Sequence, residues 1–279
     1  MRNPPILVLG ATGRIGTILR RVWPAGRALW QSRAAGPGVA QIDPLGDPAV
    51  LARAAAGGET ILCLSGVVPG RAGRMADNIA LGLAAVRAAR PGARVLLASS
   101  AAVYGRAPGP LAETAAPARE TACARAKLAM ETEAGALGAD RGVAVTALRI
   151  GNIAGIDAIL GGWRPGFDLD RFTDGRTPRR SYIGPATLAR VLLALCDSAA
   201  PLPPVLNVAA PGLLEMGALL DAAGLAWAPR PAPPAAIPEV ALDVALLGGF
   251  CPFDPRDSLA ATMVAEWRAL SETEMKPET

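Results

Sequence analysis

The sequence predicts an α/β protein built on a doubly wound parallel β-sheet. Short apolar runs alternate with amphipathic or alanine- and leucine-rich stretches along much of the 279 residues. This rhythm is typical of right-handed strand–helix–strand crossovers, which place helices over a parallel sheet. The first crossover also contains a glycine-rich turn between its strand and its helix. These observations together define the fold class.

The first strand and its turn are the clearest part of the pattern. Residues 6–9 are all apolar, which suits a strand buried on both faces, and helical spacing then continues to Val22. Gly10 permits a tight turn, Gly13 lets the backbone approach a pyrophosphate, and Gly16 lets helix and strand pack closely. The pyrophosphate would bind at the helix N-terminus, although glycine clusters also form ordinary turns. The expected dinucleotide contacts in this turn are Gly10, Thr12, Gly13, Arg14, Ile15 and Gly16.

The end of the second predicted strand, residues 27–31, bears on the choice of cofactor. An acidic residue at this point would bind the ribose hydroxyls of NAD, whereas an arginine suits the 2′-phosphate of NADP. Arg33 stands in this place, and Arg14 is in the glycine turn nearby. We therefore expect NADP, with NAD as the other possibility. The alternative is that both arginines are exposed surface charges.

The remaining elements follow in the same rhythm. Ligands of such sheets bind at the carboxyl ends of the strands. Further cofactor contacts are therefore expected at Asp43, Leu64, Ser65, Gly66, Ile150 and Asn152. Residues 157–180 have no clear periodicity, and residues 229–238 look like a linker or surface loop. The expected strands are 38–43, 60–64, 94–98, 143–149 and 205–208, and the expected helices are 47–56, 75–90, 120–137 and 185–197.

Composition excludes several classes of function. No apolar run reaches the roughly 18 residues of a membrane helix, and because the glycine motif comes so early we expect no signal peptide. The net charge of +4 comes with scattered arginines and no nucleic-acid-binding motif, so no nucleic acid is expected. The chain has no histidine and no CxxC pair among its 4 cysteines, so we expect no histidine triad and no metal site. A reduced, cytoplasmic setting is the default.

A set of motifs, in the right order over nearly the whole chain, resembles the extended short-chain dehydrogenase/reductase family, also called the NAD-dependent epimerase/dehydratase family. The resemblance implies a Rossmann-type domain at 1–155, to which 184–210 return. It also implies a small C-terminal substrate lobe formed by 156–183 and 211–279. The matching pieces are GATGRIG at 10–16, Asn78, ASSAAVYG at 98–105, LRIGNIAG at 148–155, RSYIGPATLARVLLAL from 180 and LNVAAP from 206.

The reacting set of that family is a serine or threonine, a tyrosine and a lysine. Ser100 and Lys127 match the first and the last, and Glu131 follows as in the family pattern. The tyrosine position, four residues before the lysine, holds Cys123. A thiol can carry negative charge beside an ammonium, but it is shorter than tyrosine by about 4 Å. We take Ser100, Cys123 and Lys127 as the catalytic candidates, and we expect Lys127 also to bind the cofactor through its ribose hydroxyls. The alternatives are a helix cap or turn residue for Ser100 and a surface pair with Glu131 for Lys127.

Substrate contacts are implied by the same resemblance. In nucleotide-sugar members an arginine before an aromatic–aliphatic pair contacts the diphosphate, and Arg180 fits that position; a solvated basic loop is the alternative. Asn78 and Tyr182 are the other expected contacts. Neither Tyr104 nor Tyr182 is an obvious replacement for the missing tyrosine, and Tyr182 is the better candidate of the two. Family members commonly form homodimers through the helices expected here at 75–90 and 120–137.

Two functions from different classes are open on this sequence. The first is an NAD(P)-dependent epimerase, dehydratase or reductase acting on a sugar-like or other hydroxyl or carbonyl substrate, such as a nucleotide sugar. The second is a catalytically silent NADP-binding sensor or regulatory protein. Cys123 favours the second function, whereas Ser100, Lys127 and Asn78 favour the first.

Overall fold

A computed structural model describes residues 5–67 and 73–272 of the chain. Its backbone divides into two compact units. The first unit comprises Met1–Gly105, Pro117–Arg149 and Leu192–Leu206, and the second comprises Arg106–Ala116, Ile150–Val191 and Asn207–Thr279. Each unit is therefore assembled from three separate stretches of chain. The sequence-based division, with residues 1–155 in the nucleotide-binding part, stays a prediction.

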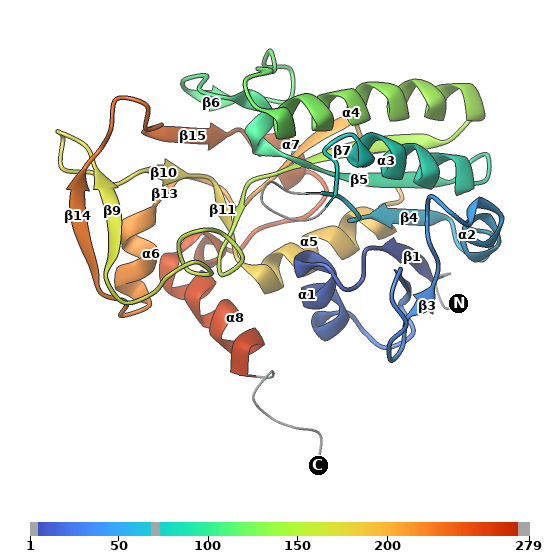
Figure 1. Ribbon diagram of the computed structural model, residues 1–279, viewed down its shortest axis with the longest axis horizontal. Coiled ribbons are helices and arrows are strands. Elements are labelled where there is room, and N and C mark those ends of the chain that lie inside the picture. Colours follow the sequence, from blue (N-terminus) through green and yellow to red (C-terminus); the bar gives the residue numbers. More distant parts are fainter. Residues whose placement is uncertain (1–4, 68–72, 273–279) are drawn as a thin grey trace. The chain divides into compact units, whose positions relative to one another are not determined.

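The first unit is built on a seven-stranded sheet with the strand order β12-β7-β5-β4-β1-β2-β3 (Figure 1). The pairs that join β3, β2, β1, β4 and β5 are all parallel. The strand order reverses direction at β1, so the crevice at the carboxyl end of β1 is where a ligand of such a sheet is expected. The strands are β1 (Ile6–Leu9), β2 (Ala28–Ser32), β3 (Ala40–Gln41), β4 (Thr60–Cys63), β5 (Arg94–Ser100), β7 (Ala144–Ile150) and β12 (Val205–Val208).

Helices cover both faces of this sheet. Alternate strand residues such as Leu7, Ile61 and Val95 form one core cluster with buried residues of α2 (Pro48–Ala55), α3 (Asp77–Ala88) and α4 (Ala122–Arg141). Figure 1 shows α1 (Arg14–Val22) and α5 (Pro185–Asp197) on the other side of the sheet. Strands that are buried on both faces need continuous apolar runs, which is why the sequence pattern predicted them correctly. The expected strands and helices of this sheet are confirmed.

The second unit contains short strands that the sequence pattern did not predict. They form a four-stranded sheet in the order β13-β10-β15-β6 and two separate pairs, β11-β8 and β14-β9. The helices of this unit include α6 (Met216–Ala222), α7 (Ala245–Gly248) and α8 (Ala260–Glu272). The strands are β6 (Pro110–Leu111), β8 (Asn152–Ile153), β9 (Phe167–Arg171), β10 (Arg179–Arg180), β11 (Tyr182–Ile183), β13 (Leu214–Glu215), β14 (Trp227–Pro231) and β15 (Glu239–Leu242).

The prediction of a loop over residues 229–238 was wrong at its start. Strand β14 extends to Pro231 and pairs in parallel with β9 along its whole length. Proline lacks the N–H group that a central strand must donate, so it is tolerated only where one edge of the strand needs no partner. A two-stranded sheet supplies such an edge, and Pro229 and Pro231 are both exposed.

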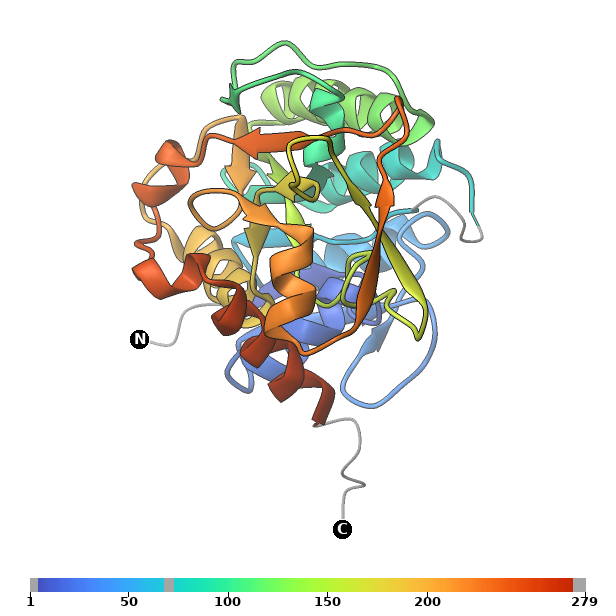
Figure 2. The same ribbon diagram turned by 90° about the vertical axis from the view of Figure 1, so that its left-hand side faces the viewer.

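Three consecutive residues of α8 join distant parts of the second unit. The carboxylate of Glu266 accepts hydrogen bonds from the backbone N–H groups of Ala186 and Thr187, at 2.9 and 3.0 Å, at the start of α5. The ring of Trp267 lies so close to Gly155 that a Cβ added there would clash with the ring. The guanidinium of Arg268 donates to the Ala223 carbonyl just beyond α6. Figure 2 shows α6 and α8 side by side, and their apolar residues share one core cluster.

Candidate cofactor and active site

The glycine turn between β1 and α1 is closely packed on its inner side. Gly10 has φ +87°, and a Cβ there would meet the Ser65 backbone nitrogen at 2.9 Å. At Gly16 a Cβ would clash with the Gly10 carbonyl oxygen. Gly13 is the N-cap of α1 and makes no side-chain cap, and the first turn of α1 carries no acidic residue. The start of α1 therefore fits an anion such as a pyrophosphate.

Gln31 holds this turn from the neighbouring strand. Its side-chain oxygen accepts a hydrogen bond from the Gly10 N–H at 3.0 Å, and its side-chain nitrogen donates to the Ile42 carbonyl at 2.5 Å. Gln31 is only 1 % exposed. Sequence reasoning missed this residue, although a glutamine at the end of an otherwise apolar strand was a usable signal.

Two hydroxyl groups lie close together where β2 ends. The hydroxyl oxygens of Thr12 and Ser32 lie 3.4 Å apart, and the Ser32 hydroxyl accepts a hydrogen bond from the Ala34 N–H. Arg33 and Arg14 are exposed. Asp43, which follows β3, is also exposed, and its carboxylate accepts a hydrogen bond from the Leu45 N–H at 3.1 Å.

The end of β4 meets α3 and α4 beside the glycine turn. The Leu64 N–H donates to the Leu9 carbonyl. A Cβ on Gly66 would lie 2.7 Å from the side-chain oxygen of Asn78 and 3.4 Å from the Lys127 ammonium nitrogen. The structure thus places the glycine turn beside Ser65, and Gly66 beside Lys127. Cofactor contacts at these residues stay a prediction.

Asn78 is used to hold the chain after β4. Its side-chain oxygen accepts from the Val67 N–H, and its nitrogen donates to the carbonyls of Val67 and Met75, with distances of 3.0 or 3.1 Å. The side chain is buried. These bonds occupy both donors of the amide, so a contact between Asn78 and substrate stays a prediction.

Lys127 is a buried cation near two thiols. Its ammonium, on a residue that is 9 % exposed, donates to the Ala98 carbonyl at 2.7 Å. Burial lowers the pKa of Lys127, while the nearby Cys63, Cys123 and Glu131 act to raise it. The reading of Lys127 as a surface residue is therefore wrong. Burial likewise raises the pKa of Cys63 to about 11, opposed by the charge of Lys127.

Glu131 pairs with Arg149. The Arg149 Nη2 atom lies 2.8 Å from Oε2 of Glu131, and Nε lies 3.3 Å from both carboxylate oxygens. The Ser99 hydroxyl donates to the same carboxylate, and the Arg149 guanidinium lies 4.9 Å from the centre of the Tyr104 ring. Arg149 and Ser99 were not among the predicted site residues.

Ser100 and Cys123 lie at the ends of two elements of the first unit. The Ser100 hydroxyl accepts a hydrogen bond from the Ala102 N–H at 3.2 Å and caps the short 3-10 helix η1 (Ala101–Tyr104). Cys123 is the second residue of α4, which begins after the Thr121 N-cap. Cys123 is half-buried, whereas Cys63, Cys196 and Cys251 are buried. Reacting roles for Ser100 and Cys123 stay predictions.

The other predicted residues belong to the second unit. The Tyr182 hydroxyl donates to the Asp157 carboxylate at 2.7 Å, and Tyr182 is 1 % exposed. Burial raises the pKa values of both Tyr182 and Asp157. Arg180 is half-buried in β10 and donates to the carbonyls of Arg179 and Ile237, so it is not part of a solvated loop. Ile150 is buried at the end of β7, and Asn152 begins β8.

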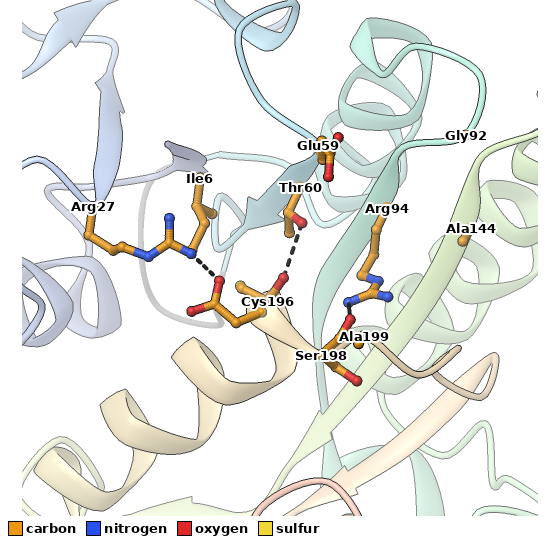
Figure 3. Close-up of a pocket in the computed structure, with 11 residues that line it drawn as sticks. Ile6, Arg27, Glu59, Thr60, Gly92, Arg94, Ala144, Cys196, Ser198 and Ala199 are labelled. Carbon is orange, nitrogen blue, oxygen red and sulfur yellow. Dashed lines mark hydrogen bonds and ion pairs between the residues drawn. The ribbon is translucent and has the colours of Figure 1, made fainter. Parts of the chain in front are cut away.

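A cavity of about 310 Å³ lies at the opposite edge of the sheet, at the amino ends of β1, β4 and β5 (Figure 3). Arg27 pairs there with Asp197, and Arg94 donates to the carbonyls of Leu195 and Ser198 at the end of α5. Both guanidinium groups thus cap or tether α5. We therefore interpret this cavity as a structural feature, separate from the candidate site.

Two negative findings apply to the part of the chain that the structure describes. Within residues 5–67 and 73–272, no helix is long and apolar enough to cross a membrane. Across the same residues, histidine, cysteine, aspartate and glutamate side chains form no cluster of three or more that could hold a metal ion.

A parallel sheet whose order reverses at β1, with a glycine turn and a bare helix N-terminus at that point, defines a Rossmann-type dinucleotide-binding fold. The family model of the NAD dependent epimerase/dehydratase family matches residues 6–159. The chain belongs to this family. No curated protein sequence matches it significantly.

Solved structures share the fold at low sequence identity. MoeE5 in complex with UDP-glucuronic acid and NAD is 22% identical with a TM-score of 0.74, over 96% of this chain and 99% of that chain. UDP-glucuronic acid 4-epimerase from Bacillus cereus, in complex with UDP-glucuronic acid and NAD, is 16% identical with a TM-score of 0.76, over the same shares. TunA, an NAD dependent NDP-hexosamine 5,6-dehydratase involved in tunicamycin biosynthesis, is 19% identical with a TM-score of 0.72, over 96% of this chain and 98% of that chain.

Proposed function

We propose that this protein is an NADP-dependent enzyme of the epimerase, dehydratase or reductase type that acts on a hydroxyl or carbonyl group of a nucleotide sugar. The observation that carries the proposal is the position of Lys127. Its ammonium is buried beside Gly66 and donates a hydrogen bond to the neutral Ala98 carbonyl rather than to a carboxylate. A buried cation without an ion-pair partner is costly, and such perturbed groups concentrate at functional sites.

The residues of the first unit fit a dinucleotide. The N–H groups at the start of α1 suit a pyrophosphate, and the Lys127 ammonium suits ribose hydroxyls because it is a compact donor on a flexible stem. Thr12, Ser32 and Arg33 supply hydroxyl and guanidinium groups that suit the 2′-phosphate of NADP. A bound nicotinamide supplies the capacity to accept or donate a hydride. NAD is the other cofactor to test, because the solved relatives named above contain NAD.

Ser100 and Cys123 are the residues proposed to bind the reacting oxygen of the substrate and to exchange its proton. Ser100, at the end of β5, would donate a hydrogen bond to the reacting oxygen of the substrate and hold it in place. Cys123, one helical turn before Lys127, would exchange the proton. Because the thiol is shorter than a tyrosine side chain, the reacting oxygen would have to approach α4 more closely than in a tyrosine enzyme.

The substrate class is supported by the relatives. Two of them are complexes with UDP-glucuronic acid, and the third is an NDP-hexosamine dehydratase. In this chain Arg180 is the proposed diphosphate contact, with Asn78 and Tyr182 as further contacts. Arg180 carries a fixed positive charge, which suits phosphate groups.

The experiment is a two-stage assay on the purified chain. Calorimetry first measures the affinity for NADP(H) and NAD(H). A panel of UDP- and dTDP-sugars is then incubated with the tighter-binding cofactor, and product formation and the near-ultraviolet absorbance of the reduced nicotinamide are followed. Binding with turnover supports the proposal, whereas binding of neither cofactor overturns it.

The second candidate function is a catalytically silent NADP-binding sensor or regulatory protein. Cys123 favours it, because a cysteine occupies the position of the family's proton donor. Tight cofactor binding with no turnover of any sugar in the panel would establish this second function instead.

A homodimer that forms through α3 and α4 is part of the proposal, as are a cytoplasmic location and a substrate lobe made of 156–183 and 211–279. The two helices pack against each other and are rich in alanine and leucine. Light scattering at micromolar concentration tests the dimer, and a monomer mass would reject it.

A further inference from the structure

Lys127 and Glu131 occupy positions i and i+4 of α4, where opposite charges normally attract each other. The two side chains do not bond here. The Lys127 ammonium donates to the Ala98 carbonyl of β5, and the Glu131 carboxylate faces Arg149 of β7. A contact outside α4 therefore keeps the Glu131 carboxylate away from Lys127.

The guanidinium of Arg149 outcompetes the ammonium by geometry. Its Nε and Nη2 atoms form a fork onto Glu131, with a shortest distance of 2.8 Å. A planar fork matches a carboxylate at two points, whereas an ammonium offers a single point charge. The pair is closed off from water, with side-chain exposures of 6% for Arg149 and 8% for Glu131.

Both partners of this ion pair are fixed by further contacts. The Ser99 hydroxyl donates to Glu131, which leaves the carboxylate little freedom to turn towards Lys127. The guanidinium of Arg149 lies over the ring of buried Tyr104, which belongs to η1. Ser99 adjoins Ser100, so the same network also holds the end of β5.

We propose that Arg149 is a positioning residue of the lysine site. It binds the Glu131 carboxylate and thereby leaves the Lys127 ammonium free for a ligand. This inference rests on the proposed role of Lys127 as a cofactor contact, and it goes further by naming the residue that keeps Lys127 available. Neither Arg149 nor Glu131 needs to touch the ligand for this purpose.

Removal of Arg149 would leave Glu131 as a buried carboxylate with an uncompensated charge. Lys127, one helical turn before Glu131 on α4, is then a cation with which it can pair. The ionisable groups that face Lys127 are Cys63 from β4 and Cys123 and Glu131 from α4. Of these, Glu131 is the one whose partner changes. An Arg149→Met variant should therefore bring Glu131 onto Lys127.

The test is a titration of Lys127 itself. The chain contains two lysines, Lys127 and Lys276, so protein labelled with ¹³C at the lysine Cε gives two resonances, which Lys276→Arg assigns. Arg149→Met should raise the Lys127 pKa by about one pH unit or more. It should also weaken cofactor binding about tenfold, since the ammonium is then shared with a carboxylate.

The double variant Arg149→Met/Glu131→Gln distinguishes this role from a purely structural one. It removes both charges, so the Lys127 pKa should return to that of Glu131→Gln alone, and cofactor affinity should recover to near wild type. The matched control is Arg141→Met, at an exposed arginine of α4. It should change neither the Lys127 pKa nor the cofactor affinity. If Arg149→Met does not fold, Arg149→Gln replaces it with the same expectations.

An unchanged Lys127 pKa in the folded Arg149 variant would overturn the inference, as would a double variant that fails to reverse the shift. The titration needs no cofactor. If the wild-type chain bound neither NADP nor NAD, the proposed function would fail while the titration still decided the role of Arg149.

Discussion

The side chain of Gln31 accepts a hydrogen bond from the backbone N–H of Gly10, and so joins the end of β2 to the turn that follows β1. A second bond, from the Gln31 amide to the Ile42 carbonyl, continues to the segment after β3. One buried glutamine thus sets the position of the first glycine of the dinucleotide turn.

Replacement of Gln31 by Met should lower the free energy of unfolding by about 2 kcal/mol. The Gly10 N–H and the Ile42 carbonyl would both lose their partner, and an unsatisfied buried polar group costs about 1–3 kcal/mol. Chemical denaturation measures the loss. Gln41→Met, at an exposed site on β3, is the control and should change stability by less than about 0.5 kcal/mol. Equal stability of the two variants would contradict this assignment to Gln31.

Arg33→Ala should remove the preference for NADP over NAD. A guanidinium bound to a phosphate is a charge-assisted contact, so its loss should weaken NADP(H) binding about tenfold and leave NAD(H) binding nearly unchanged. Calorimetry with both cofactors measures the two affinities. Arg53→Ala, an exposed arginine on α2, should alter neither one. Equal or tighter binding of NAD(H) by the wild-type protein would reject the NADP assignment.

Cys123 should be the cysteine that a thiol reagent modifies in the folded protein. The other three cysteines are buried, so alkylation should stop at one equivalent per chain and should disappear in Cys123→Ala. The control variant Cys63→Ala should still take up one equivalent. Mass spectrometry after a short exposure decides the matter, and modification of a buried cysteine first would contradict the prediction.

The same residue separates the two candidate functions. If Cys123 exchanges the substrate proton, Cys123→Ala should lower turnover by roughly 10²-fold, the usual contribution of a general acid or base. Cys123→Tyr should also change turnover, because it restores the longer side chain of the family. A silent binding protein would instead show no turnover, and cofactor affinity would be nearly unchanged in both variants.

The buried ammonium of Lys127 should make stability rise with pH. Burial lowers the Lys127 pKa in the folded protein, so between that value and the ordinary value of 10.5 the unfolded chain binds more protons. The free energy of unfolding then increases with pH, by up to about 1.36 kcal/mol per pH unit. Lys127→Met should abolish this increase.

Cys63 changes the free energy of unfolding with pH in the direction opposite to Lys127. Its contribution must therefore be removed from the comparison of the proteins with and without Lys127. Its pKa is raised from 9.0 to about 11, so it lowers stability as pH rises from 9 through 11. Both proteins should therefore carry Cys63→Ala, and denaturation should be measured from pH 7 upwards. Parallel stability curves with and without Lys127 would show that its pKa is not lowered.

Tyr182→Phe should destabilise the second unit more at neutral pH than in acid. The variant removes the hydroxyl that donates to Asp157, and a hydrogen bond to a charged group contributes about 1.5–3 kcal/mol. Burial already raises the Asp157 pKa. In acid Asp157 takes up a proton, so the variant no longer buries a charged carboxylate that has lost its hydrogen-bond donor. The cost should also shrink in an Asp157→Asn background. A cost that is equal at both pH values would contradict this account.

The central sheet was predictable because its signals are local. Apolar strands such as Ile6–Leu9 and the glycine turn can be read within a few consecutive residues. The contacts that organise the site are different in kind. Glu131 and Arg149 are 18 residues apart, and nothing in α4 alone says that the carboxylate will turn towards β7 instead of Lys127. Tertiary packing decides between two possible partners there, and local pattern cannot.

Strands of two residues explain most of what was missed in the second unit. Pairs such as Arg179–Arg180 and Tyr182–Ile183 are too short to show an alternating pattern. The assignment of Cys123 to the tyrosine position rests on the sequence alone and stays a prediction. The structure adds that Cys123 lies in the first turn of α4.

The contacts of Glu266, Trp267 and Arg268 bear on the order in which parts of this protein can fold during its synthesis at the ribosome. The second unit needs Gly155, the start of α5 and the end of α6, yet the side chains that hold these three points come from α8, the last helix among the residues that the structure describes. Residues 150–191 therefore lack the contacts from α8 while more than half of the second unit is still being synthesised. We expect residues 150–191 to be the part of the nascent chain that chaperones bind.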